Sequence, residues 1–133
     1  MSEVNFKVIT PGGVLYEEKI NKLTIRTLDG YITVLPNHFP LATTIVSSIC
    51  DFNVNDKNIR AFTGSGILQV SEKDIKLIVS AFNFKDEIDI ERARRALDRA
   101  NGYLSSNDPN IDKERALKAK IRAESRIGLW EGK

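Results

Sequence analysis

Apolar and polar residues alternate along most of residues 4–84, and this period of two predicts a series of short β-strands. Val4, Phe6 and Val8, for example, share one face of a strand that ends at the Pro-Gly-Gly turn of residues 11–13. Turn-forming residues interrupt the alternation about every 8 to 12 residues. Many short strands with regular turns are typical of a β-sandwich, which we predict for this part of the chain.

The periodicity changes from 2 to 3.6 at Asp86, where the composition shifts to the helix formers Ala, Arg, Glu and Leu. Asp89 and Asp112 are suited to cap two helices, and the polar stretch 105–110 separates them. Apolar residues at helical spacing then mark one stripe on each predicted helix: Ala93, Leu97, Ala100 and Leu104 on the first, and Ala116, Ala119 or Lys120, Ala123, Ile127 and Trp130 on the second.

Two helices joined by a short break predict an antiparallel hairpin. We therefore expect two domains, a β-sandwich over residues 1–85 and a helical hairpin over residues 86–133. Alanine-rich stripes let helices approach closely but bury few methylene groups, at about 0.8 kcal/mol each, so the hairpin should be marginally stable alone. It could form a fixed lid on the sandwich or a mobile arm that docks elsewhere.

The composition is that of a soluble globular protein, with 41% hydrophobic and 29% charged residues. No apolar run is long enough to span a membrane, no signal peptide is apparent, and a single cysteine excludes an internal disulfide, so we expect a cytosolic location or a cytosolic face. Residues 88–133 hold 11 Lys and Arg against 8 Asp and Glu, which favours an anionic ligand or an acidic partner for the hairpin. A nucleic-acid adaptor that uses this basic tail is the alternative function.

No constellation for catalysis is present, and we expect a protein that is not an enzyme. Cys50 and His38 are the only candidates for a Cys-His pair, but Cys50 falls on an alternating apolar face and is predicted to be a core thiol. The Gly64-Ser65-Gly66 segment lacks the residues of a phosphate-binding loop or of a nucleophile turn and is predicted to connect two strands. One Cys and one His also leave no basis for a metal cluster.

The hairpin contains the same pattern twice, Ile-Asp-x-Glu-Arg-Ala at residues 88–93 and again at residues 111–116. Arg92 and Arg99 are seven residues apart, and Arg122 and Arg126 are four apart, so each pair lies along one face of its helix. If these faces converge, their guanidinium groups match the oxygens of a phosphate. The same spacing also fits a solvated surface with Glu–Arg pairs, and spacing alone leaves both interpretations open.

At these residues the chain resembles the ε subunit of bacterial F-type ATP synthases over essentially its whole length. The similar segments are VITPGGVLYE at 8–17, LPNHFPLAT at 35–43, GILQVSEKDIKLIVSAF at 66–82 and the repeated Ile-Asp-x-x-Arg-Ala. The resemblance implies a ten-stranded sandwich with a C-terminal helical hairpin. It also implies a non-catalytic subunit of the central rotor stalk, peripheral to the cytoplasmic face of the cell membrane, which helps couple proton-driven rotation to ATP synthesis.

The resemblance implies partners as well. The sandwich is expected to bind the γ subunit and the c ring, whereas the hairpin extends along γ toward the α and β subunits in a form that blocks ATP hydrolysis. The family's acidic contact to the c ring is missing from residues 30–33, and Tyr31 and His38 are expected to make that contact instead.

No cofactor is expected to be required, but the resemblance implies ATP as a regulatory ligand that favours the folded hairpin. Asn83 stands where an acidic residue sometimes helps to hold the nucleotide. The residues that fall on the positions of the family's ATP site are Ile88, Asp89, Arg92, Ala93, Arg99, Arg122 and Arg126.

Overall fold

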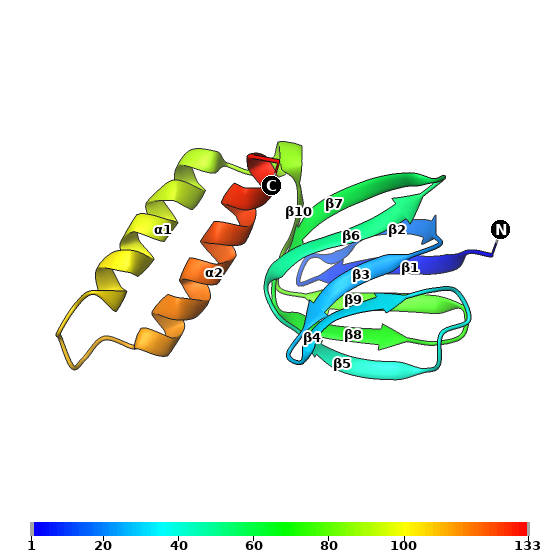
Figure 1. The fold of residues 1–133 in the computed structure, drawn as a ribbon, viewed down its shortest axis with the longest axis horizontal. Coiled ribbons are helices and arrows are strands. Elements are labelled where there is room, and N and C mark those ends of the chain that lie inside the picture. The colour runs from blue at the N-terminus through cyan, green and yellow to red at the C-terminus, as the bar shows by residue number, and fades with distance from the viewer. Residues whose placement is uncertain (1, 133) are drawn as a thin grey trace.

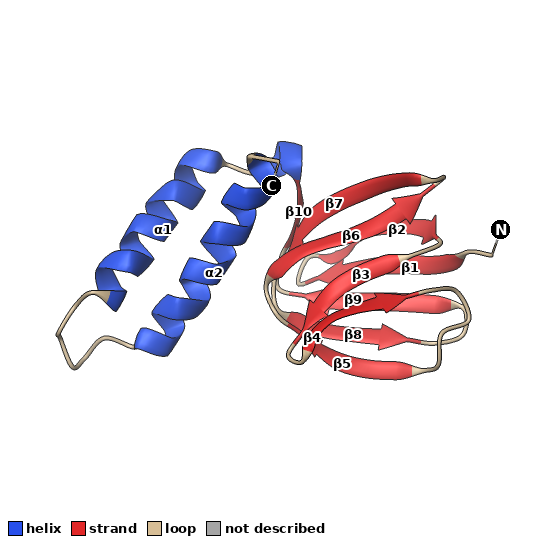
Figure 2. Ribbon diagram, in the orientation of Figure 1, coloured by secondary structure: helices blue, strands red, loops and turns tan. Residues whose placement is uncertain are grey.

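A computed structural model describes residues 2–132, which form ten β-strands followed by two helices (Figures 1 and 2). The prediction of a ten-stranded β-domain with a C-terminal helical hairpin is confirmed. The strands are β1 (Val4–Thr10), β2 (Gly13–Ile20), β3 (Leu23–Thr27), β4 (Gly30–Val34), β5 (Leu41–Ile45), β6 (Ser48–Val54), β7 (Lys57–Thr63), β8 (Gly66–Val70), β9 (Asp74–Val79) and β10 (Phe82–Phe84).

Hydrogen bonds join the strands into one curled sheet in the order β10-β7-β6-β3-β5-β8-β9-β1-β2, with β4 paired to β3 off this path. Neighbouring strands are antiparallel except β1 and β9, which pair in parallel from Asn5 with Asp74 to Ile9 with Ile78. Because alternate residues of each strand face the inside of the curl, the alternation seen in the sequence supplies the core.

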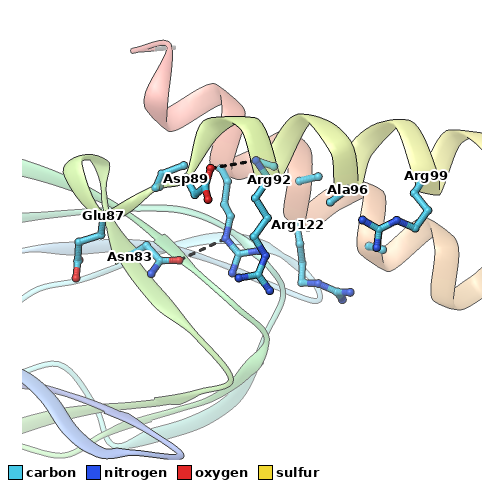
Figure 3. Close-up of a pocket in the computed structure, with 12 residues that line it drawn as sticks. Asn83, Glu87, Asp89, Arg92, Ala96, Arg99 and Arg122 are labelled. Carbon is cyan, nitrogen blue, oxygen red and sulfur yellow. Dashed lines mark hydrogen bonds between the residues drawn. The ribbon is translucent and has the colours of Figure 1, made fainter.

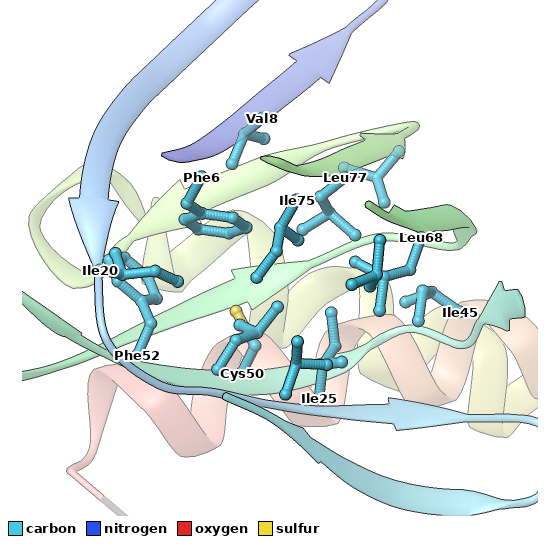
Figure 4. Packing of buried hydrophobic residues seen from close by; sticks show 14 of the residues in the cluster. Phe6, Val8, Ile20, Ile25, Ile45, Cys50, Phe52, Leu68, Ile75 and Leu77 are labelled. Atoms are coloured by element: carbon cyan, nitrogen blue, oxygen red, sulfur yellow. The ribbon is translucent and has the colours of Figure 1, made fainter. Parts of the chain in front are cut away.

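The core lies inside the curled sheet (Figure 4). Aromatic rings form its end near β10, where the ring centroids of Phe6 and Phe52 are 5.1 Å apart and those of Tyr16 and Phe84 are 5.2 Å apart. Cys50 is fully buried among these apolar side chains. The alternating apolar residues Val4, Phe6, Val8 and Cys50 are therefore core residues, as predicted.

A short 3-10 turn, η1 (Lys85–Glu87), links β10 to helix α1 (Ile90–Leu104). Asp89 caps α1 as predicted, because its Oδ1 accepts a hydrogen bond of 3.1 Å from the backbone N–H of Arg92. Asp112 caps helix α2 (Lys113–Trp130) in the same way. The change of periodicity at Asp86 therefore marks the 3-10 turn, and the regular helix begins four residues later.

The two helices are antiparallel and lie beside the sandwich, with α2 next to the strands and α1 on the outside (Figure 1). Only alanines are buried in α1, namely Ala93 and Ala100. In α2 the prediction that Trp130 continues the inward stripe is wrong, because Leu129 is buried and Trp130 is 39% exposed. Leu129 follows Gly128, which lies close to Ile49 of β6, so the last turn of α2 contacts the sandwich as well as α1.

Candidate functional site

A cavity of ≈ 410 Å³ lies where the start of α1 and the second half of α2 meet the last strand of the sandwich. We refer to it as the proximal cavity. All seven residues of the expected ATP site line it, and the structure therefore brings together what the sequence analysis grouped by resemblance. The other lining residues are Asn83, Glu87, Ala96, Ala119 and Ala123.

The hairpin geometry explains why these arginines converge. Arg92 and Arg99 are two helical turns apart on α1, and Arg122 and Arg126 are about one turn apart on α2. Since the helices are antiparallel, the start of α1 lies beside the end of α2, and the side chains extend to the same side of the hairpin (Figure 3). Small side chains between the arginines, such as Ala96, leave the space open.

The proximal cavity carries an excess of positive charge, since four arginines face two carboxylates. Both carboxylates already accept backbone hydrogen bonds, Asp89 from Arg92 and Glu87 from Phe84 at 2.8 Å. Among the described residues, the side-chain ion pairs involve other cations, and none of the four cavity arginines takes part in one. The interpretation of a solvated surface with Glu–Arg pairs therefore fits these four arginines poorly.

Arg126 is the most constrained of the four. Its Nε donates a hydrogen bond of 3.3 Å to Oδ1 of Asn83, and its guanidinium lies 4.2 Å from the ring centroid of Phe62. Burial lowers the pKa of Arg126, and the neighbouring charges of Arg122 and Arg92 lower it further. An anion in the cavity would oppose this lowering of the pKa by offsetting the repulsion.

The contacts of Arg126 show a structural role that the sequence analysis missed. Phe62 is fully buried, yet it does not belong to the core cluster inside the curled sheet. It lies next to Arg126 of α2, so the guanidinium connects the hairpin to β7 and β10 at once. The sequence holds one signal for this contact: Ala61 and Phe62 are adjacent apolar residues, which breaks the alternation of an otherwise half-buried strand.

The residues expected to contact the c ring are not brought together. Tyr31 is the second residue of β4 and is 62% exposed, whereas His38 lies in the loop beyond the other end of that strand. His38 is half-buried, and its Nδ1 lies 2.8 Å from the carbonyl oxygen of Phe39. Phe39 itself is 85% exposed, which makes it the more accessible apolar group of this loop. The sequence contained a signal for this exposed group, since Phe39 is an apolar residue in the loop between His38 and Pro40.

The candidates that were set aside for catalysis have plain structural roles. Burial raises the pKa of the Cys50 thiol to about 12, and the charge of Asp51 adds to the effect, so the nucleophilic thiolate is suppressed at neutral pH. Gly64 and Ser65 connect β7 to β8, as predicted. Within residues 2–132, no three His, Cys, Asp or Glu side chains gather as metal ligands. None of the helices in this range combines the length and the apolarity needed to cross a membrane.

Sequence comparisons agree with the resemblance. Residues 3–85 match the family domain described as "ATP synthase, Delta/Epsilon chain, beta-sandwich domain". The ATP synthase epsilon chain of Clostridium kluyveri is 35% identical over 133 residues, which covers 97% of this chain and 98% of that protein. This chain belongs to the ATP synthase epsilon chain family. The epsilon chain of Staphylococcus haemolyticus is 30% identical and covers 98% of both proteins.

Solved structures show the same fold at lower identity. A chain of the Euglena gracilis mitochondrial ATP synthase superposes with a TM-score of 0.81 at 20% identity, over 94% of this chain and 79% of that chain. A chain of the Tetrahymena thermophila central stalk and c-ring structure gives a TM-score of 0.59 at 11% identity, over 98% and 96%. The alternative of a nucleic-acid adaptor receives no support from the family or its members.

Proposed function

We propose that this protein is the regulatory epsilon subunit in the rotor of an ATP synthase, with ATP as a ligand that holds its hairpin in the folded position. The observation that carries the nucleotide part is the proximal cavity, where seven residues expected from the family pattern meet between a folded hairpin and the sandwich. Membership in the epsilon chain family supports the proposal that the protein is a subunit of the rotor. The protein itself does not catalyse hydrolysis in this proposal.

The mechanism is a shift between two positions of the hairpin. ATP that binds only the folded form stabilises it by RT ln(1 + [ATP]/Kd), or about 1.4 kcal/mol at ten times Kd. The helices bury few side chains larger than alanine against each other, so a free energy of this size is large enough to matter. When ATP is scarce, the hairpin extends along γ toward the α and β subunits and stops hydrolysis.

The sandwich supplies the attachment to γ and to the c ring at the cytoplasmic face of the membrane. Its exposed apolar side chains support a role in contacts, since Leu28 is 71% exposed, Tyr31 62% and Phe39 85%. His38 precedes Phe39 in the same loop, and its Nδ1 contacts the carbonyl oxygen of Phe39. Purification of the complex from membranes, followed by identification of the bound γ and c subunits, tests the attachment. Recovery of this chain without either subunit would contradict it.

Calorimetry of the purified chain with ATP tests the ligand. Wild type should bind ATP in the proximal cavity below millimolar concentration, and Arg92→Ala should weaken binding in that cavity at least tenfold because a charged phosphate contact is lost. Arg95→Ala removes the same charge from an exposed position of α1 outside the cavity and serves as the control. Equal binding by the two variants would contradict the assignment of the proximal cavity.

Hydrolysis by the assembled complex tests the regulation. At an ATP concentration that only partly saturates wild type, Arg92→Ala should increase inhibition, since the folded hairpin loses its ligand. Complexes that carry Arg95→Ala should behave as wild type. If Arg92→Ala leaves inhibition unchanged while calorimetry shows weakened binding, ATP binds but does not regulate.

A further inference from the structure

The repeat in the hairpin is longer than its six-residue motif and has a structural counterpart. Residues 88–100 and 111–123 are identical at 8 of 13 positions when shifted by 23 residues. Matching alanines of the two copies are equally buried: Ala93 and Ala116 are each 5% exposed, and Ala100 and Ala123 are each 2% exposed. Two antiparallel helices with matching sequences are related by an approximate twofold axis that runs between them.

This symmetry requires the proximal cavity to have a counterpart at the other end of the hairpin, where α2 begins and α1 ends. The structure contains it as a second cavity of ≈ 610 Å³, which we call the distal cavity. Apart from Asn83, which has no counterpart there, the lining of the proximal cavity gives that of the distal cavity by the shift of 23 residues. Arg115 takes the place of Arg92, Tyr103 that of Arg126, and Asn110 that of Glu87. Arg99 and Arg122 line both cavities, and the shift of 23 residues relates one to the other.

The distal cavity has the charge of an anion site. Arg99, Arg115 and Arg122 face a single carboxylate, that of Asp112, whose Oδ1 already accepts a hydrogen bond of 3.0 Å from the backbone N–H of Arg115. In the part of the chain that the structure describes, none of these three arginines belongs to an ion pair. Guanidinium groups in this arrangement match the oxygens of a phosphate chain.

Tyr103 gives the distal cavity a group that the proximal cavity lacks. Tyr103 is 46% exposed and lines the cavity together with Asn110 and Ile111. An exposed aromatic face next to phosphate ligands suits a planar base, and stacking of a base on an aromatic ring contributes about 1–3 kcal/mol. Arginine and aromatic groups together distinguish a nucleotide from a simple anion.

The geometry points to a second nucleotide site in the distal cavity, where a nucleoside polyphosphate binds in the opposite direction to one in the proximal cavity. Its phosphates contact Arg115 and the shared Arg99 and Arg122, and its base lies against Tyr103. The inference takes only its ligand class from the proposed function. Because both ligands use Arg99 and Arg122, binding at one end weakens binding at the other.

The two sites have different consequences for the hairpin. The proximal cavity includes Asn83 of the sandwich, whereas every residue that lines the distal cavity comes from residues 96–122. A proximal ligand therefore connects the hairpin to the sandwich. A distal ligand connects α1 to α2 and leaves the contact with the sandwich unchanged.

Titration of the full ¹⁵N-labelled chain with ATP tests the distal site, with the amide chemical shifts as the measured quantity. Saturating shifts are expected at Tyr103 and Ile111 in wild type and in Arg92→Ala, and Arg115→Ala should weaken the distal response at least tenfold. Lys118→Ala removes the same charge from an exposed position of α2 outside both cavities and should leave the distal affinity unchanged. Identical distal titrations for Arg115→Ala and Lys118→Ala would overturn the proposal.

The same titration separates this proposal from the proposed function. Shifts that saturate at Asn83 and Glu87 but not at Tyr103 and Ile111 would support the proximal site and refute the distal site. Shifts that saturate only at Tyr103 and Ile111 would support the distal site and refute the proximal site. Tripolyphosphate, which lacks a base, tests the base contact. Tyr103→Ala should weaken ATP binding in the distal cavity by five-fold or more and leave the affinity for tripolyphosphate unchanged. Equal effects on both ligands would refute the role given to Tyr103.

Discussion

Replacement of Arg126 by methionine should release the hairpin from the sandwich even when no nucleotide is present. The substitution keeps most of the aliphatic stem but removes the hydrogen bond to Asn83 and the cation–π contact with Phe62. A hydrogen bond from a charged donor contributes about 1.5–3 kcal/mol and a partly desolvated cation–π contact about 0.5–2 kcal/mol. Loss of Arg126 also relieves its burial cost and its repulsion with Arg122 and Arg92, and the two contacts overlap, so docking should weaken by about 1–3 kcal/mol.

Arg122→Met is the matched control. Arg122 carries the same charge on the same helix and lines the same cavity, but no described contact connects it to the sandwich. Its removal lessens the repulsion felt by Arg126. Without nucleotide, docking of this variant should therefore equal or slightly exceed that of wild type, whereas its response to ATP should be lost.

Distances between spin labels measure the docked population directly. Labels at Glu124→Cys on α2 and Lys76→Cys on β9 occupy exposed positions, and the buried Cys50 thiol does not compete for the reagent. A loss of 2 kcal/mol lowers the ratio of docked to undocked molecules about 30-fold, which turns a single distance into a broad distribution. If Arg126→Met and Arg122→Met show the same distribution without ATP, the docking role assigned to Arg126 is wrong.

Three further substitutions test the fold. Gly102→Ala should stabilise α1 by about 1 kcal/mol, seen as roughly five-fold slower amide hydrogen exchange, because no atom beyond its chain neighbours and the local helix backbone lies within 4 Å of the new β-carbon. Gly66→Ala should lower the free energy of unfolding in urea by about 1–3 kcal/mol, because its β-carbon would collide with the carbonyl oxygen of Ile78. Cys50 should react with Ellman's reagent only on unfolding. Since folding raises its pKa from 9.0 to about 12, the unfolded chain loses this proton first, and stability should fall by about 1.4 kcal/mol per pH unit between pH 9 and about 12 relative to Cys50→Ala.

Local patterns predicted the elements and much of the site. Alternation in β6 identified Cys50 as a core residue, and the Asp caps placed the start of each helix within the repeated motif. The grouping of Arg92 with Arg126 did not follow from spacing, since it depends on which faces of two helices meet. The family resemblance supplied that pairing, and the antiparallel packing accounts for it.

Contacts between distant parts of the chain were not predictable in this way. The parallel pairing of β1 with β9 joins strands separated by most of the sandwich sequence, and no local signal specifies it. The position of Phe62 depends on where α2 docks, because a side chain on the outer face of β7 becomes buried only when a second layer covers it. Trp130 was misplaced for the same reason: the last turn of α2 faces both α1 and the sandwich, so a single stripe does not describe it.

The sandwich breaks the symmetry of the hairpin, and this gives the two ends different roles. The repeat alone would make the proximal and distal cavities equivalent, and a ligand at either end would then only hold α1 against α2. At the proximal end, however, Asn83 completes the lining, and Arg126 stands where the distal end has Tyr103. A ligand that binds there contacts Arg126, the residue of α2 that also contacts Phe62 and Asn83 of the sandwich. In the proposed mechanism, therefore, only the proximal end converts the presence of a nucleotide into a change in the position of the hairpin.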